Sequence, residues 1–351
     1  MANSPNLVQI AEQLAADYLS RRNYAALAIA LVQGDKTFLN TFGTSSTNSG
    51  TLDSRTLFEI GSITKVFTGI CLAQLLIDSA AKLDDSIALY LPETVKFSPS
   101  VQTITLKHLA THSSGLPRLP QNLDLTAVDP ENPYKNYGVQ DLYQALETVE
   151  LLAEPGTQYE YSNFGMTLLG YLLALRTNQS YESLVQQIIC QPLSLTDTAI
   201  VLTPEQQQRL IAPHSPDGQI VFHWDFGELP AAGGLRSTPQ DMLQFLQASL
   251  GQIESPVKRA IERSQQPEFE SGNDRLGLAW HILHLPEKPL WHWHNGGTGG
   301  FVSFLGIDRS HQTGVVLMAN SGDAMAEDSS LDVIALQLID AASQIPLSHS
   351  E

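Results

Sequence analysis

The sequence predicts an α/β (α+β) fold in which a sheet domain is built from both ends of the chain and a helical domain is inserted between them. Two observations lead there: strand-like segments occur near both ends, and the middle is mostly helical in pattern. The economical division is a discontinuous α/β sheet domain from residues 1–60 and 230–351, with a mainly helical domain over 61–229. A functional site is then expected in the cleft between the two.

The first sixty residues show a helix followed by a hairpin. Apolar residues recur at helical spacing over residues 6–20. Two strand-like runs follow, residues 26–32 and 37–39, and the Gly34-Asp35 pair between them predicts a turn. Gly61 then permits a tight turn, and the apolar pattern behind it predicts a helix from near Ser62 through Leu76.

The rest of the chain alternates helical patterns with loops before it returns to strands. Residues 117–137 contain four prolines and predict a long surface loop. Thr238-Pro239-Gln240-Asp241 predicts a helix start, with Thr238 as N-cap and Asp241 reaching back to it. The C-terminal elements are predicted as strands over 276–284, 290–294, 300–307 and 313–319, and a closing helix over 330–343.

Composition excludes several classes of function. The net charge of −18 repels phosphate backbones and anionic lipids, so we predict no nucleic-acid partner. No run of 18 uncharged apolar residues occurs, which predicts no membrane span. The two cysteines, Cys71 and Cys190, lie in apolar patterns and are expected in the core without a disulfide framework.

The N-terminus lacks a basic start followed by an apolar stretch. We therefore expect a cytoplasmic protein if the chain is full-length, and a periplasmic or extracellular one if a leader was removed. Oligomeric state is not indicated by the sequence.

The motif Ser-x-x-Lys occurs three times, at Ser62/Lys65, Ser79/Lys82 and Ser255/Lys258. About one such match is expected by chance in a chain of this length, so context has to decide. The second and third matches lie at what the pattern indicates are solvated helix ends. Only Ser62 opens a helix with an apolar run behind it.

That placement suits a nucleophile. A serine at a helix N-terminus lies in the positive end of the helix dipole, which favours developing negative charge. Lys65 is one turn away on the same face, and its amine, if desolvated, can act as a base toward the hydroxyl. The alternative is that Ser62 is an ordinary helix N-cap.

Tyr-x-Asn occurs twice, at Tyr134/Asn136 and Tyr161/Asn163. The first pair lies in the proline-rich loop and is expected on the surface. The second precedes a helical pattern and can face a cleft. A phenol beside Lys65 is expected to be ionised readily and to act as a general base, and Asn163 offers a donor and an acceptor to a substrate amide. A core tyrosine and a turn asparagine are the alternative.

The segment His294-Asn295-Gly296-Gly297 ends a predicted strand. Its glycines allow a substrate backbone to lie close to the strand, and His294 could hold a carboxylate or relay a proton. If His294 binds that carboxylate as imidazolium, KM should rise as the pH climbs through about 6 to 7.

Four histidines between 281 and 294 raise the question of a metal. No His-Glu-x-x-His motif and no cysteine cluster accompanies them, so we predict no metal and no cofactor. The Gly-x-Ser-x-Gly nucleophile elbow is also absent from the sequence.

Taken in order, Ser-x-x-Lys, Tyr-x-Asn and His-x-Gly resemble the serine β-lactamase and penicillin-binding protein superfamily, most closely class C β-lactamases, D,D-carboxypeptidases and related esterases. Other segments that resemble this branch are 109–117, 232–238 and 314–320. The resemblance covers nearly the whole chain. It implies a β-lactamase-like fold, with an antiparallel sheet flanked by helices and an inserted all-helical domain. It also implies a small-molecule or peptide substrate that carries a carboxylate.

The resemblance also implies roles. Ser62 is the nucleophile, Lys65 and Tyr161 share the proton transfers, and Asn163 orients the substrate amide. The N–H groups of Ser62 and Gly297 form the oxyanion hole, with His294, Asn295, Gly296 and Gly297 along the substrate. His112 is expected to be structural.

One departure separates the chain from the β-lactamases of this branch. They usually carry Lys-Thr-Gly where this chain has His-Asn-Gly, so a permanent cation is replaced by a titrating one. Three readings follow: a hydrolase of D-peptide or β-lactam amides, a carboxylesterase on the same fold, and a penicillin-binding protein with little turnover. The natural substrate, and hydrolysis as against acyl transfer, stay open.

Overall fold

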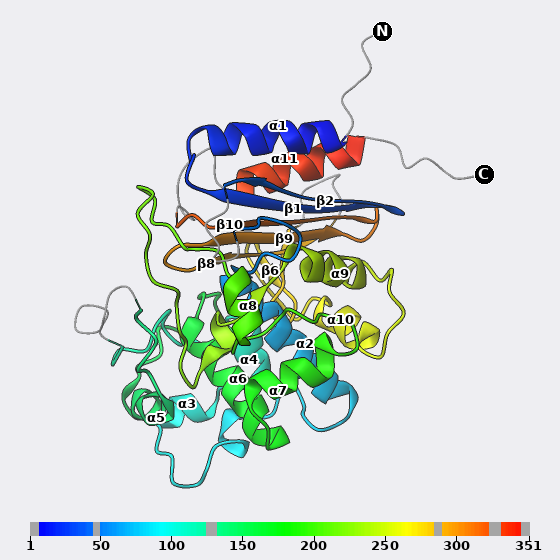
Figure 1. Ribbon diagram of the computed structural model, residues 1–351. Coiled ribbons are helices and arrows are strands. Elements are labelled where there is room, and N and C mark those ends of the chain that lie inside the picture. Colours follow the sequence, from blue (N-terminus) through cyan, green and yellow to red (C-terminus); the bar gives the residue numbers. More distant parts are fainter. Residues whose placement is uncertain (1–6, 45–49, 124–131, 284–289, 323–330, 345–351) are drawn as a thin grey trace.

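The computed structural model describes residues 7–44, 50–123, 132–283, 290–322 and 331–344. Its centre is an antiparallel sheet whose strands come from both ends of the chain (Figure 1). In spatial order the strands are β2 (Lys36–Gly43), β1 (Ala26–Gln33), β10 (Thr313–Ala319), β9 (Val302–Asp308), β8 (Trp291–Gly297), β7 (His281–Leu283), β6 (Asp274–Leu276) and β5 (Phe269–Ser271).

Strand β1, next to the edge strand β2, shows why helices cover both faces of the sheet. Its alternating side chains divide between two apolar cores: Leu27, Ile29 and Leu31 join one, and the smaller alanines between them join the other. The first core is closed by α1 (Leu7–Ser20) and α11 (Leu331–Gln344), which lie together on the outer face in Figure 1. An apolar strand of this kind is stable only when both its faces are covered.

The inner face carries the larger, mostly helical body (Figure 1). Helix α9 (Pro239–Ser249) packs on β1 and β10, and α10 (Lys258–Ser264) packs on α2 (Thr64–Ile77). The remaining elements, in chain order, are β3 (Phe58–Glu59), η1 (Gly61–Ile63), η2 (Ile87–Leu89), α3 (Pro99–Gln102), α4 (Leu106–Ala110), α5 (Val139–Thr148), α6 (Asn163–Thr177), α7 (Tyr181–Val185), η3 (Gln186–Cys190), α8 (Pro204–Arg209), η4 (Pro230–Ala232) and β4 (Arg236–Ser237).

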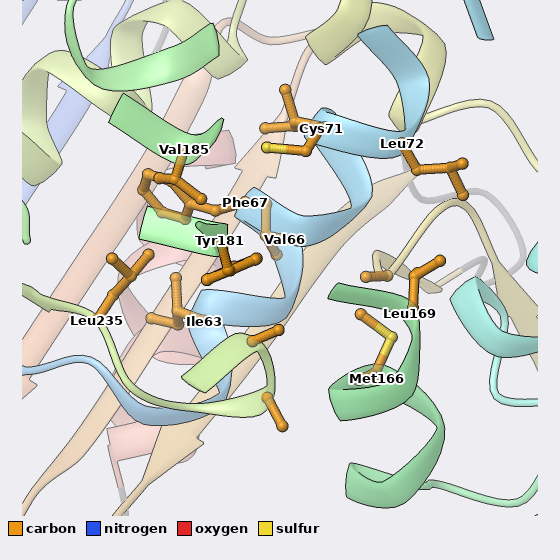
Figure 2. Packing of buried hydrophobic residues seen from close by; sticks show 14 of the residues in the cluster. Ile63, Val66, Phe67, Cys71, Leu72, Met166, Leu169, Tyr181, Val185 and Leu235 are labelled. Carbon is orange, nitrogen blue, oxygen red and sulfur yellow. The ribbon is translucent and has the colours of Figure 1, made fainter. Parts of the chain in front are cut away.

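Helix α2 runs through the middle of this body and is buried on nearly all sides. Figure 2 shows its side chains between Met166 and Leu169 of α6 and Tyr181 and Val185 of α7. Cys71 on this helix is buried and free, as is Cys190, so the two predicted core thiols are confirmed. Burial of α2 fixes its N-terminus, where Ser62 lies, against the end of the sheet.

Three predictions about local structure need correction. The predicted strand 276–284 is broken: Leu278 N–H donates to Ser264, Ala279 N–H donates to Ala110, and the chain turns with Ala279 at φ +61° before β7. The short strand β5 was not predicted. At α9, Thr238 is the N-cap, but the Asp241 carboxylate does not reach back to it. It accepts hydrogen bonds from the Asp197 N–H and the Thr198 hydroxyl, because these buried donors need a partner.

The division into two domains, 1–60 with 230–351 and 61–229, remains a proposal. The two-stranded ribbon of β3 and β4 lies where the chain passes between the proposed parts. Within the described ranges, no helix is both long enough and apolar enough to cross a membrane.

Candidate active site

Ser62 lies in η1, directly before α2, at the end of the turn that Gly61 makes with φ +50°. The Lys65 Nζ atom lies 2.8 Å from Ser62 Oγ and donates a second hydrogen bond of 2.6 Å to the Ala232 carbonyl. Ala232 is the last residue of η4, which packs on α2, so the amine is held from both sides. The lysine is therefore oriented toward the hydroxyl before any substrate arrives.

The Lys65 side chain is completely buried. Burial, with a smaller contribution from the positive charge of Arg118, lowers its pKa well below 10.5. A lowered pKa favours the neutral amine near neutral pH, and only the neutral amine can accept a proton. Lys65 is thus the group of the pair that is prepared to act as a base.

Tyr161 does not carry the charge that the sequence suggested. Its hydroxyl is hydrogen-bonded to Ser62, and burial raises its pKa to about 12, against the opposing effects of the Ser62 bond and of Arg118. The prediction of a readily ionised phenol was wrong, because desolvation of the phenolate outweighs the nearby cation. Tyr161 instead presents a protonated hydroxyl beside the nucleophile.

Two glycines allow the turn that carries Ser62 to pack closely against the end of β8. A Cβ on Gly61 would lie 2.6 Å from the Gly297 nitrogen, and a Cβ on Gly296 would lie 2.2 Å from the Ile60 carbonyl oxygen. The same Gly296 position is 3.0 Å from the Ser62 nitrogen. The peptide nitrogens of Ser62 and Gly297, which were predicted for the oxyanion hole, therefore both lie at this contact.

Strand β8 also keeps a free edge here. Its register with β7 ends at Trp293, while its register with β9 continues to Gly297. In the described part of the sheet, the segment after Trp293 therefore has no strand neighbour on the β7 side. An extended substrate backbone could pair with that edge.

Asn163 is the first residue of α6, whose N-cap is Ser162. Its backbone N–H donates to the Arg118 carbonyl, and its side chain is hydrogen-bonded to the Tyr134 hydroxyl. The Asn163 Oδ1 atom is buried without a protein partner. An orphaned buried acceptor of this kind suits a donor supplied by a substrate amide.

The surroundings of His294 disfavour the imidazolium form on which its conditional role as a carboxylate holder depends. The side chain is fully buried, and its Nδ1 atom lies 2.6 Å from the Asn295 carbonyl oxygen. Burial, followed by the neighbouring His281 and Lys65, lowers its pKa well below 6.5. Because strand side chains alternate, His294 points toward the core, and the neighbouring Asn295 side chain points to the other face and donates to Asp332 at 2.9 Å.

His112 has the supporting place expected of it. Its Nδ1 atom accepts the Ser162 N–H at 3.1 Å, and its ring lies against Tyr161 with the centroids 4.6 Å apart. It therefore connects the N-terminus of α6 with the Tyr161 phenol. Of the histidines considered as metal ligands, His284 lies outside the described residues, and among the described ones no group of three metal-ligating side chains is found.

A cavity of about 780 Å³ opens over these groups. Six of the predicted residues line it, namely Ser62, Tyr161, Asn163, Asn295, Gly296 and Gly297. Lys65 and His294 lie behind this lining, and Lys65 reaches it through Ser62.

Sequence reasoning missed the other lining residues, and the titratable side chains among them include Arg118, Tyr134, His281 and Asp332. Tyr134 was expected on the surface and instead faces Asn163. The first Tyr-x-Asn pair, Tyr134/Asn136, was the available signal for Tyr134. Arg118 follows directly on the segment 109–117 that already resembled the family, while nothing local marks Asp332.

Comparison with known proteins assigns the chain to a family. The profile of the family described as Beta-lactamase matches residues 11–338. A beta-lactamase from Yersinia enterocolitica is 26% identical over 339 residues, which cover 86% of this chain and 84% of the relative. The D-alanyl-D-alanine-carboxypeptidase/endopeptidase AmpH from Escherichia coli (strain K12) is 27% identical over 303 residues, covering 80% and 75%.

The fold comparison agrees. The crystal structure of a beta-lactamase/D-alanine carboxypeptidase from Pseudomonas syringae superposes with a TM-score of 0.82 at 22% identity, covering 98% of this chain and 99% of that one. A class C beta-lactamase superposes with a TM-score of 0.83 at 20% identity, covering 97% and 98%. The predicted β-lactamase-like fold is confirmed. The chain belongs to the Beta-lactamase family of serine hydrolases, as the order of its three motifs predicted.

Proposed function

We propose that Ser62 is the nucleophile of an acyl-serine hydrolase that cleaves D-alanyl peptide or β-lactam amides. The observation that carries the proposal is the buried Lys65 amine, 2.8 Å from Ser62 Oγ, with a pKa well below its usual value. Relatives named for β-lactam and D-alanyl-D-alanine cleavage support the substrate class.

In the proposed first step, neutral Lys65 accepts the Ser62 hydroxyl proton while Oγ attacks the substrate carbonyl carbon. The carbonyl oxygen becomes an oxyanion that the Ser62 and Gly297 N–H groups stabilise. The tetrahedral intermediate then expels the amine. The protonated Tyr161 hydroxyl, hydrogen-bonded to Ser62, is placed to pass a proton to that amine, and the lysine proton replaces it.

The second step releases the acyl group. Water attacks the acyl-serine carbonyl, loses a proton to the Lys65 and Tyr161 pair, and leaves a carboxylic acid and a free Ser62 hydroxyl. Asn163, with its buried unpartnered Oδ1, would accept a hydrogen bond from an amide N–H of the substrate through both steps. The free edge of β8 would hold the substrate backbone.

A substrate carboxylate needs a holder other than His294, which is uncharged and buried. We assign that role to Arg118, the cation among the described residues that line the cavity. Its guanidinium carbon lies 5.0 Å from the Tyr161 ring centroid, close to where the leaving group departs. An arginine also binds carboxylates in a bidentate manner, which an imidazole cannot do.

One observation favours a second candidate, a carboxylesterase. The residue that replaces the usual lysine of β-lactamases is neutral here, and Asp332 lies beside Asn295, so this part of the cavity repels a carboxylate. Neutral esters avoid that repulsion. Their alkoxide leaving group also depends less on protonation than an amine does.

The test is intact-mass spectrometry after brief exposure to penicillin G, with nitrocefin turnover followed in parallel. A mass adduct that Ser62→Ala abolishes is expected. The matched control is Ser255→Ala, which alters the serine of another Ser-x-x-Lys motif and should leave the adduct intact.

Three outcomes separate the candidates. An adduct with slow turnover means a penicillin-binding peptidase, and fast nitrocefin turnover means a β-lactamase. Neither adduct nor turnover, together with a higher kcat/KM on short acyl esters than on D-Ala-D-Ala peptides, means an esterase. Full activity of Ser62→Ala on every substrate would overturn the acyl-serine mechanism itself.

A further inference from the structure

Two formal charges of opposite sign face the active-site cavity. Among its described lining residues, Arg118 supplies the positive charge and Asp332 the negative one. The other titratable groups do not offset Asp332: Lys65 and His294 lie behind the lining with lowered pKa values, and burial lowers the pKa of His281 to about 4. The cavity is therefore polarised near neutral pH.

The two charges come from different layers of the fold. Arg118 belongs to the loop after α4 in the helical body, whereas Asp332 lies in the first turn of α11 on the outer face of the sheet (Figure 1). Asp332 reaches the site through Asn295, whose Nδ2 atom donates to its Oδ2 atom at 2.9 Å. Asn295 is two residues from Gly297, so this carboxylate stands beside the segment that binds the reacting carbonyl.

The surroundings of Asp332 reduce the screening of its charge. The side chain is half-buried, and with Trp293 it also lines a neighbouring cavity of about 390 Å³ that is mainly apolar, with Leu336 and Ile339 on its wall. Poor hydration of this kind reduces dielectric screening. Burial raises the pKa of Asp332, and the hydrogen bond from Asn295 opposes that rise by stabilising the carboxylate.

We propose that Asp332 is a specificity-determining residue that selects substrates carrying a cationic group, such as a free ammonium, where they meet Asn295, and that it rejects substrates carrying a carboxylate there. Together with Arg118, it would fit a short zwitterionic peptide with its charges toward opposite walls. The inference rests on the proposed acyl-serine function and narrows its substrate class.

A purely structural role is the competing explanation, since an acidic residue in the first turn of a helix stabilises that helix. The variant Asp332→Asn separates the two, because the amide oxygen can still accept the Asn295 hydrogen bond while the charge is lost. Asp340→Asn is the matched control. It removes the same charge from the same helix, and Asp340 lines the neighbouring apolar cavity but is not among the residues that line the active-site cavity.

The probes are three phenylboronic acids with an aminomethyl group, hydrogen or a carboxyl group at the meta position. A boronic acid accepts the Ser62 oxygen as a fourth ligand of boron and mimics the tetrahedral intermediate, so binding does not depend on amide or ester preference. Dissociation constants are measured at neutral pH by isothermal titration calorimetry. Thermal melting checks that each variant is folded.

In the wild-type protein we expect a preference for the aminomethyl over the carboxyl compound. Asp332→Asn should reduce the ratio of the two dissociation constants by about tenfold, with the unsubstituted compound little changed, since only the charge at this wall differs. Asp340→Asn should preserve the wild-type ratio.

A ratio that Asp332→Asn leaves unaltered, with all three compounds weakened equally or unaffected, would overturn the inference and leave the acyl-serine function standing. If none of the three compounds bound the wild-type protein, the reactive serine itself would be in error, and the inference would fail with it.

Discussion

The contact between Gly61 and Gly297 offers the sharpest test of how the site is built. In Gly61→Ala, the new Cβ would lie 2.6 Å from the Gly297 nitrogen, whereas ordinary contact begins near 3.4 Å. The difference, 3.4 − 2.6 = 0.8 Å, is the distance by which the turn and β8 must separate. That shift moves one donor of the proposed oxyanion hole.

The expected loss follows from hydrogen-bond geometry. A bond of about 2.9 Å that lengthens by a comparable amount no longer meets hydrogen-bond criteria. Loss of one oxyanion-hole donor costs about 100- to 1,000-fold in kcat, or roughly 3–4 kcal/mol of transition-state stabilisation. We therefore expect Gly61→Ala to lower acylation and turnover by that factor.

Backbone strain must be subtracted from this result, because Gly61 has φ +50° and alanine in this region costs about 1–2 kcal/mol. Gly272→Ala is the matched control: Gly272 has φ +60°, and its added Cβ would meet nothing within 4 Å. Both variants should lose similar conformational stability, but only Gly61→Ala should also lose catalytic activity.

The assay is the rate of acylation by a fluorescent penicillin, with turnover of nitrocefin and p-nitrophenyl acetate, and thermal melting of both variants. If the kcat/KM of Gly61→Ala stayed within about threefold of that of Gly272→Ala, the close packing of turn and strand would not form the oxyanion hole.

Three further predictions concern protonation. Because burial lowers the Lys65 pKa, its base form gains population as the pH rises, so acylation should rise with pH and level off well below pH 10.5; a rate still climbing there would contradict Lys65 as base. Because the pKa of His294 is lowered, KM for carboxylated substrates should stay flat from about pH 6 to 7, as for neutral esters, and a rise confined to the carboxylated ones would restore the imidazolium. Because burial raises the pKa values of Cys71 and Cys190, iodoacetamide at pH near 8 should label neither thiol before denaturation, and labelling of native protein would refute their burial.

Most of the secondary structure could be predicted from the sequence because its signal is local. Apolar spacing gave α1, β1, α11 and the start of α2 to within a few residues of their ends. The prediction failed where tertiary contacts decide the backbone. The turn at Ala279 is held by hydrogen bonds to Ser264 and Ala110, more than ten residues away in the sequence, so periodicity could not reveal it.

The candidate site divides in the same way. The three motifs predicted a shared site for Ser62, Tyr161, Asn163 and the glycines of β8, and these residues line one cavity. Their protonation states were not predictable, because they depend on burial. The sequence suggested a lysine beside an ionised phenol, but desolvation lowers the pKa of the Lys65 amine and raises that of the Tyr161 phenol.

The sequence by itself determined the family and the glycines that allow the Ser62 turn to meet β8, and it is the basis for proposing Ser62 as the nucleophile. Only the tertiary structure decided which charges face the substrate. It turned His294 into the core, brought Arg118 beside Tyr161, and placed Asp332 next to Asn295 from a helix on the opposite face of the sheet. The physical reason is that side-chain alternation and solvent exposure are set by packing between distant segments, and these determine which groups stay charged.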